Sequence, residues 1–147
     1  MNKTILDLLN KERISVLSLI LPNGNSHSAT MHFSFTPEAF KFYFQTANSS
    51  IKVMGLLSGE TTKASLVIGT SEVDWSTFQA HGTIHAISDQ AELDKIYKIH
   101  YLKQPQAEQY KSDPETMFLE FTPTWWRHTD FKVQPETIIE MDNGAIK

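Results

Sequence analysis

Apolar and polar side chains alternate along much of the chain, with the two-residue period of strands that bury one face. The clearest stretch is Phe-Lys-Phe-Tyr-Phe-Gln-Thr at 40–46, which predicts a central strand with one buried face. The same kind of pattern predicts further strands over 14–21, 26–35, 63–70, 77–88 and 116–121. The Asn23-Gly24 dipeptide between the first two strands is a strong signal for a hairpin turn.

Helical spacing is confined to short segments. Apolar residues recur three to four positions apart over 3–11, and Ile96, Tyr97 and His100 follow the same spacing within 90–101. Shorter helices are predicted over about 50–57 and 105–110. Strands joined by hairpins, with few short helices, predict a mainly β α+β fold, a small antiparallel barrel with flanking helices. We expect one domain over 1–147, because no repeat or linker interrupts the chain.

The junction after the central strand carries the strongest candidate chemistry. The strand ends in Thr46, and Asn48, Ser49 and Ser50 are all residues that favour helix N-caps. The positions expected on the buried side of the following helix are Ile51, Met54, Leu56 and Leu57. Backbone N–H groups, the hydroxyls of Thr46 and Ser50 and the charge of Lys52 would together suit a phosphate. The alternative is that the serines only cap their own helix.

Composition narrows the class of protein. Hydrophobic residues make up 40% of the chain and charged residues 20%, as in ordinary globular proteins. The absence of cysteine excludes disulfides and thiolate metal sites and is compatible with a cytoplasmic protein. A net charge of −4 argues against a nucleic-acid partner, and no segment has the length of a membrane span.

Two histidines on the predicted strand 77–88 suggest a metal site at first sight. His81 and His85 share one strand face but lie four residues apart, which corresponds to about 13 Å. One ion cannot bridge that separation, so we expect no metal.

The order of Thr46, Asn-Ser-Ser-Ile-Lys at 48–52, a short helix and an apolar strand resembles the FMN-phosphate region of the pyridoxamine 5′-phosphate oxidase-like split-barrel family. The resemblance covers about residues 3–131. It implies an antiparallel split barrel, a homodimer with flavin at the subunit interface, and FMN held through its phosphate by Thr46, Ser50 and Lys52. Many members have an arginine where this chain has Ile51.

The resemblance also implies contacts to the flavin ring. They involve the strand before the central one, mainly through its backbone, together with Gln45 and either Thr77 or Gln79. An aromatic and basic segment after the last strand would reach a flavin bound mainly to the other subunit. The cofactor-binding positions implied in addition to the phosphate site are Ala29, Thr30, Met31, His32, Gln45, Thr77, Gln79, Trp126 and Arg127, with Trp125 as a register alternative to Trp126. In the other interpretation, the tryptophans pack in a core or dimer seam and Arg127 is solvated.

The function implied is that of an FMN-dependent oxidoreductase acting on an unidentified small molecule. The segment from Trp126 to Phe131 only partly matches the basic, histidine-containing motif of true pyridoxamine phosphate oxidases. This departure argues against oxidation of pyridoxamine phosphate itself. A non-catalytic flavin-binding or stress-related protein, or a split-barrel binder of haem or deazaflavin, remains an alternative. Residues with a catalytic role are not assigned by the sequence.

Overall fold

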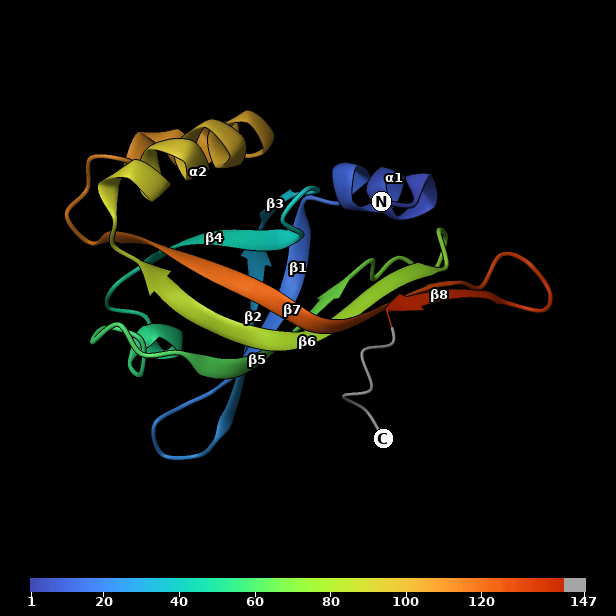
Figure 1. The fold of residues 1–147 in the computed structure, drawn as a ribbon, viewed down its shortest axis with the longest axis horizontal. Coiled ribbons are helices and arrows are strands. Elements are labelled where there is room, and N and C mark those ends of the chain that lie inside the picture. Colours follow the sequence, from blue (N-terminus) through green and yellow to red (C-terminus); the bar gives the residue numbers. More distant parts are fainter. Residues whose placement is uncertain (142–147) are drawn as a thin grey trace.

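Figure 1 shows the chain in a computed structural model, which describes residues 1–141 and contains a strongly curled antiparallel sheet. The predicted domain end, 142–147, lies outside the described residues. The strands are β1 (Ile14–Ile20), β2 (Ser26–His32), β3 (Ser34–Thr36), β4 (Lys41–Ala47), β5 (Thr62–Ile68), β6 (Ser76–Ile87), β7 (Thr116–Asp130) and β8 (Thr137–Met141). The helices are α1 (Lys3–Lys11) and α2 (Gln90–Lys103), with the 3-10 helices η1 (Ile51–Val53) and η2 (Pro105–Tyr110).

The strand order explains why the barrel is split. It runs β2-β1-β5-β6-β7-β4-β3, and β8 is added beside β7. The sheet therefore begins at β2 and ends at β3, and no ladder joins these two ends within residues 1–141. Curling brings β2 back into contact with β4 and η1. The predicted antiparallel split barrel is confirmed, and its opening lies between β2 and β4.

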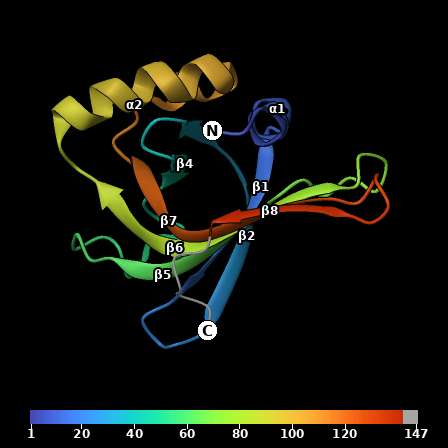
Figure 2. The ribbon, with the colours of Figure 1, turned by 45° about the vertical axis from the view of Figure 1, so that its right-hand side comes forward.

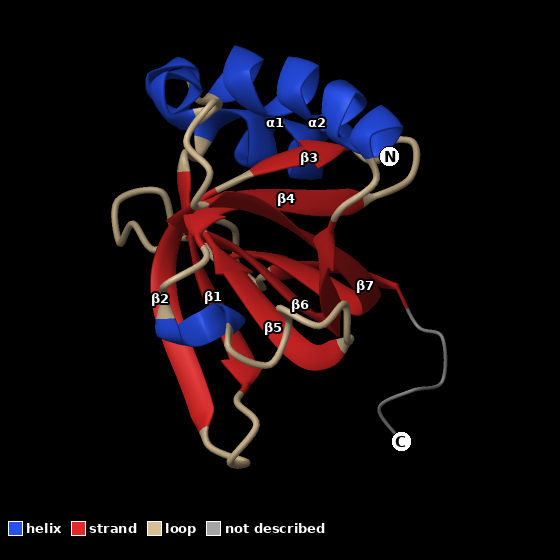
Figure 3. Cartoon of the chain, turned by 90° about the vertical axis from the view of Figure 1, so that its left-hand side faces the viewer, coloured by secondary structure: helices blue, strands red, loops and turns tan. Residues whose placement is uncertain are grey.

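The two helices cover one end of the barrel, beside β3 and β4 (Figure 3). The segment 88–115, which contains α2 and η2, connects β6 to β7, although these two strands are directly paired neighbours. None of the described helices is long and apolar enough to cross a membrane.

Aromatic side chains fill the barrel. Phe42, Phe78 and Phe121 are fully buried, and the ring centroids of Phe42 and Phe78 are 5.7 Å apart. On the opposite face of β4, Tyr43 joins a smaller cluster beneath α2 with Ile96. The central strand therefore buries both faces, which corrects the predicted single buried face, because α2 covers the side that the pattern assigned to solvent.

The helix predicted over 50–57 is wrong. Only η1 is helical, and turns follow it. Val53 and Leu56 are buried, whereas Ile51, Met54 and Leu57 are 55%, 63% and 60% exposed. Gly55 weakens helix propagation and lies so close to Pro22 that an added Cβ would be 3.2 Å from the Pro22 Cγ. The apolar residues thus follow turn geometry instead of a helical face.

The last predicted strand is too short, and β8 was not predicted. β7 continues to residue 130, paired with β6 on one side and with β8 on the other, and the β7–β8 hairpin extends beyond the barrel (Figure 2). Pro123 lies inside this strand, although proline cannot donate a hydrogen bond to a ladder. The register shifts between His81 and Gly82, opposite Pro123, which indicates a β-bulge at this point of the ladder.

Candidate functional site

A pocket of about 580 Å³ occupies the split between β2 and β4. Five of the positions predicted to bind a cofactor line it, and all come from these two strands: Thr30, Met31, His32, Gln45 and Thr46. The remaining wall comes from the end of α2, from η2 and from the start of β7: His100, Gln106, Ala107, Gln109, Tyr110, Asp113, Glu115 and Thr116, together with Ala47 of β4. The structure therefore brings the strand before the central one and the end of the central strand to one pocket, whereas Ser50 and Lys52 are not part of its lining.

Thr46, Ser50 and Lys52 form one polar cluster at the end of β4. The Lys52 Nζ donates hydrogen bonds to the Thr46 Oγ1 and the Ser50 Oγ, each at 3.2 Å, and the two hydroxyl oxygens are 3.3 Å apart. The Ser50 side chain makes no capping bond to η1. The Ser50 hydroxyl therefore does not cap this helix, contrary to the alternative interpretation. A helix of three residues also has only a small dipole with which to attract an anion.

Among residues 1–141, the charge of Lys52 has no carboxylate partner. The ion pairs within the described part of the chain involve other lysines and Arg127. Lys52 is partly buried, and this desolvation lowers its pKa. A cation that is partly desolvated and held between two hydroxyls favours an anion, because the anion restores the stabilisation that burial removes.

Gln45 holds the pocket wall in place. Its Oε1 accepts a hydrogen bond from the Tyr101 hydroxyl at 2.7 Å, and its Nε2 donates to the Ala107 carbonyl at 3.1 Å. These bonds tie β4 to both α2 and η2. Gln45 thus shapes the pocket through its neighbours, in addition to lining it.

His100 is a pocket residue that the sequence reasoning did not single out. It is 1% exposed, and its Nδ1 lies 2.8 Å from the Ser34 Oγ. Burial, and then the nearby charge of His32, lower the pKa of His100 to about 4, so the ring is neutral at pH 7. The sequence did contain a signal for His100, namely its helical spacing with Ile96, which places it on the buried face of the helix. A histidine buried there needs a polar partner, which makes it a candidate for a functional role.

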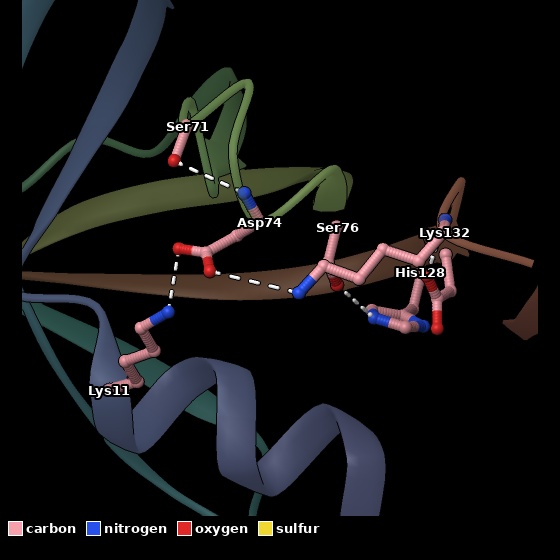
Figure 4. A network of polar contacts seen from close by, with 7 residues as sticks. Lys11, Ser71, Asp74, Ser76, His128 and Lys132 are labelled. Atoms are coloured by element: carbon pink, nitrogen blue, oxygen red, sulfur yellow. Dashed lines mark hydrogen bonds and ion pairs between the residues drawn. The ribbon is translucent and has the colours of Figure 1, made fainter.

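A second buried histidine does not line the pocket, and Figure 4 shows it beside Ser76. His128 on β7 is 1% exposed, and its Nε2 is 2.8 Å from the Ser76 Oγ. Nearby, Asp74 forms ion pairs with Lys11 of α1 and with Lys132, at 2.6 and 3.8 Å. This network joins α1 to the β5–β6 and β7–β8 connections and does not contribute to the pocket lining.

The other predicted cofactor residues do not line this pocket. Gln79 is exposed on the outer face of β6, directly opposite Arg127, and Thr77 lies two residues earlier on the same face. The Arg127 Nε donates to Glu140 at 2.8 Å, and its guanidinium lies 5.6 Å from the Trp125 ring. Ala29 packs against the barrel core.

The two tryptophans point in opposite directions. Trp126 packs against Phe40 and Phe78, with ring centroids 5.7 and 6.1 Å apart, so it belongs to the core of its own chain. Trp125 lies on the outer face, with its ring 4.8 Å from that of His81. The aromatic segment does not follow the last predicted strand, as expected, but lies within β7.

Comparison with known proteins identifies the family. A sequence model of the family described as pyridoxamine 5′-phosphate oxidase matches residues 1–130. No curated protein sequence matches the chain.

Solved structures share the fold at low sequence identity. A Clostridium acetobutylicum protein related to general stress protein 26 of Bacillus subtilis is 18% identical, with a TM-score of 0.70 over 98% of this chain and 95% of that one. A haem binding protein from Mycobacterium smegmatis is 10% identical, with a TM-score of 0.74 over 94% of this chain and 56% of that one. A conserved hypothetical protein from Mycobacterium tuberculosis is 14% identical, with a TM-score of 0.69 over 97% of this chain and 93% of that one.

Proposed function

Because the chain belongs to the pyridoxamine 5′-phosphate oxidase family, whose members commonly bind flavin, we propose that it binds FMN in the pocket between β2 and β4 and acts as a flavin-dependent oxidoreductase on a small molecule. The observation that carries the proposal is the cluster of Thr46, Ser50 and Lys52, whose one cation lacks a carboxylate partner within residues 1–141.

The residues of the cluster fit a phosphate. Lys52 and two hydroxyls supply charge-assisted and neutral donors at mutual distances of 3.2–3.3 Å. A bound phosphate would replace the weak internal bonds of this cluster with stronger ones. Ile51 is 55% exposed and offers no donor, so Lys52 carries the full charge of the site from this segment.

The free edge of β2 fits the flavin ring. Within the described residues, β2 pairs only with β1, so its other edge presents backbone N–H and C=O groups beside the pocket. Thr30, Met31 and His32 lie along this edge. Backbone groups there would hold a planar heterocycle regardless of side-chain identity.

The outer-face residues support a homodimer, which is also the typical state of this family. Thr77, Gln79, Trp125 and Arg127 lie outside the pocket of their own chain, so they would contact flavin only if it belonged to a second subunit. Trp125, with an exposed face beside Arg127, is the better candidate than the core residue Trp126. We place the flavin at the subunit interface on this basis.

When bound, FMN supplies the redox chemistry, and the chain is required to bind it, orient it and exclude water. This division of labour accounts for the lack of a nucleophile–base pair in the sequence motifs. The proposed substrate is a small molecule.

Absorption spectroscopy and FMN titration test the proposal. We expect the purified protein to show flavin bands, or to bind added FMN with quenching of its fluorescence. Catalysis is then tested by anaerobic reduction of the bound flavin with a nicotinamide donor and reoxidation by candidate acceptors. Flavin binding without any turnover would favour the non-catalytic alternative.

Haem is the second candidate because one structural neighbour is a haem binding protein and His32 and His100 both line the pocket. A Soret band in the purified protein, together with failure to bind FMN, would replace flavin with haem. Binding of a deazaflavin in preference to FMN would change the cofactor but keep the pocket.

A further inference from the structure

We propose that His100 donates a hydrogen bond from its Nε2 to an acceptor atom on the flavin ring, and that Ser34 holds the imidazole in the tautomer that makes this possible. The inference rests on the FMN binding proposed above and adds a ring-binding residue from α2, outside the strands that the family resemblance identified.

The first step is to locate the free nitrogen. His100 is 1% exposed yet lines the pocket, and Ser34 occupies its Nδ1. The enclosed side-chain atoms without a hydrogen-bond partner, among the described residues, are the Thr36 Oγ1 and the His128 Nδ1. The His100 Nε2 also has no hydrogen-bond partner among these residues, but it is not one of the two enclosed atoms. Part of its surface must therefore be accessible. It is therefore the edge of the ring that reaches the pocket surface.

The second step is to assign the proton. Ser34 is fully buried, and its hydroxyl has no partner other than His100 within residues 1–141. A buried hydroxyl proton needs an acceptor, and within residues 1–141 the Nδ1 is the only hydrogen-bond partner of this hydroxyl. The hydroxyl therefore donates to the Nδ1, which leaves the proton of the neutral ring on the Nε2. The pocket meets an N–H donor there.

The third step is the rigidity of this donor. The His100 ring packs edge-on against Phe118, with centroids 5.2 Å apart, and the end of α2 is tied to β4 through Tyr101 and Gln45. A fixed donor does not have to reorient when a ligand binds. Its natural target is a carbonyl oxygen or a ring nitrogen, and an isoalloxazine offers both.

The bond should strengthen when the flavin is reduced. Reduction places more negative charge on the acceptor atoms of the ring, and hydrogen bonds to charged acceptors are about twice as strong as neutral ones. His100 therefore favours the reduced cofactor. A residue that only supported the wall would weaken oxidised and reduced flavin equally.

His100→Phe tests this contact because it keeps the aromatic packing and removes the donor. We expect the Kd for oxidised FMN to rise about two- to tenfold, as loss of one neutral hydrogen bond predicts. The Kd for reduced FMN should rise more, so the reduction potential of bound FMN should become more negative. Ser34→Ala should shift both quantities in the same direction by less, because part of the rings would keep the correct tautomer.

His128→Phe is the matched control. His128 is buried to the same extent and also contacts a serine hydroxyl at 2.8 Å, but it lies outside the pocket. Its substitution should leave the FMN affinity and the potential unchanged. Nitrogen-15 spectra of wild-type protein need no variant: they should show a proton on the His100 Nε2, whose resonance moves when FMN is added.

Four results would overturn the inference. If His100→Phe kept the FMN affinity of the wild-type protein and the reduction potential of its bound FMN, the contact would be excluded and the proposed function would remain intact. A proton on the Nδ1 in the spectra, or an Nε2 resonance unmoved by FMN, would exclude it in the same way. Failure of the wild-type protein to bind FMN would overturn the proposed function and this inference together.

Discussion

At the scale of single residues, the folded chain keeps two imidazoles neutral by burial. The pKa of His100 falls to about 4, and burial also lowers the pKa of His128. In the unfolded chain both would titrate near 6.5. Each of them therefore links stability to pH, and the direction follows from the depressed pKa.

Stability should fall as the pH falls from about 6.5 to about 4. Above 6.5 both states are neutral at His100, whereas below it the unfolded chain takes up a proton that the folded chain excludes. The difference between about 4 and 6.5 corresponds to about 3 kcal/mol for His100. Urea unfolding at several pH values measures this loss. His100→Phe should show a shallower decline, and an identical decline would contradict the assignment.

Lys52→Met should weaken FMN binding without destabilising the apoprotein. Removal of a charge-assisted bond costs about 1.5–3 kcal/mol of binding free energy. The same change removes a partly buried charge without a carboxylate partner among the described residues, so the free energy of unfolding should stay the same or rise. Fluorescence titration and urea unfolding measure the two quantities.

Lys63→Met is the control for this charge change, because Lys63 is exposed on β5 and outside the pocket. It should leave FMN affinity unchanged. Equal loss of affinity in the two variants would indicate a general effect of net charge, and the phosphate site would then lie elsewhere.

At the scale of secondary-structure elements, the bulge between β6 and β7 depends on one missing side chain. A methyl group on Gly82 would collide with the backbone carbonyl of Thr122, and backbone cannot move away as a flexible side chain does. Gly82→Ala should therefore cost about 1–3 kcal/mol of unfolding free energy. Gly55→Ala, which meets only the Pro22 ring, should cost less in the same urea experiment. A reversed order would mean that the bulge is not rigid.

Elements with a single strong period were predictable, and elements set by tertiary contacts were not. α1, α2, β1, β4, β5 and β6 lie close to their predicted ranges because the apolar periodicity of each reflects its own burial, whereas the single strand predicted over 26–35 is divided into β2 and β3. The segment 50–57 misled because its apolar residues include three that remain exposed. β8 has a pattern too mixed to identify, since it gains its pairing from β7 and little burial of its own.

The site was predictable only in part for the same reason. Thr46, Ser50 and Lys52 are close in sequence, so local order was enough to group them. The pairing of β2 with only one neighbour, and the approach of α2 to the pocket, depend on how the sheet curls. His100 and Ser34 are 66 residues apart, and nothing in either local pattern indicates their contact.

At the scale of the whole molecule, the proposed interface site predicts complementation between defective subunits. Lys52→Ala and Arg127→Ala should each impair FMN binding, the first at the phosphate and the second from the neighbouring chain. In a mixed dimer one interface keeps both residues and the other lacks both. Random exchange should thus restore about a quarter of all sites.

Light scattering and native mass spectrometry would establish the dimer and the mixed species before titration. Each variant re-mixed with itself is the control and should restore nothing. If mixed dimers form and no FMN binding returns, the site is not shared between subunits. A monomer at micromolar concentration would contradict the interface directly.

The connection between β6 and β7 has a further consequence for how such a molecule diversifies. These strands are adjacent and antiparallel, so the 88–115 segment is in topological terms a single oversized hairpin loop. It supplies His100, Gln106 and Tyr110 to the pocket, whereas the phosphate cluster comes from elsewhere in the chain. Recombination that exchanges this one contiguous stretch would retarget the pocket toward new substrates while leaving the strand order and the anion anchor intact. Anchoring of the phosphate would therefore evolve separately from the pocket wall, which includes the ring contact proposed for His100.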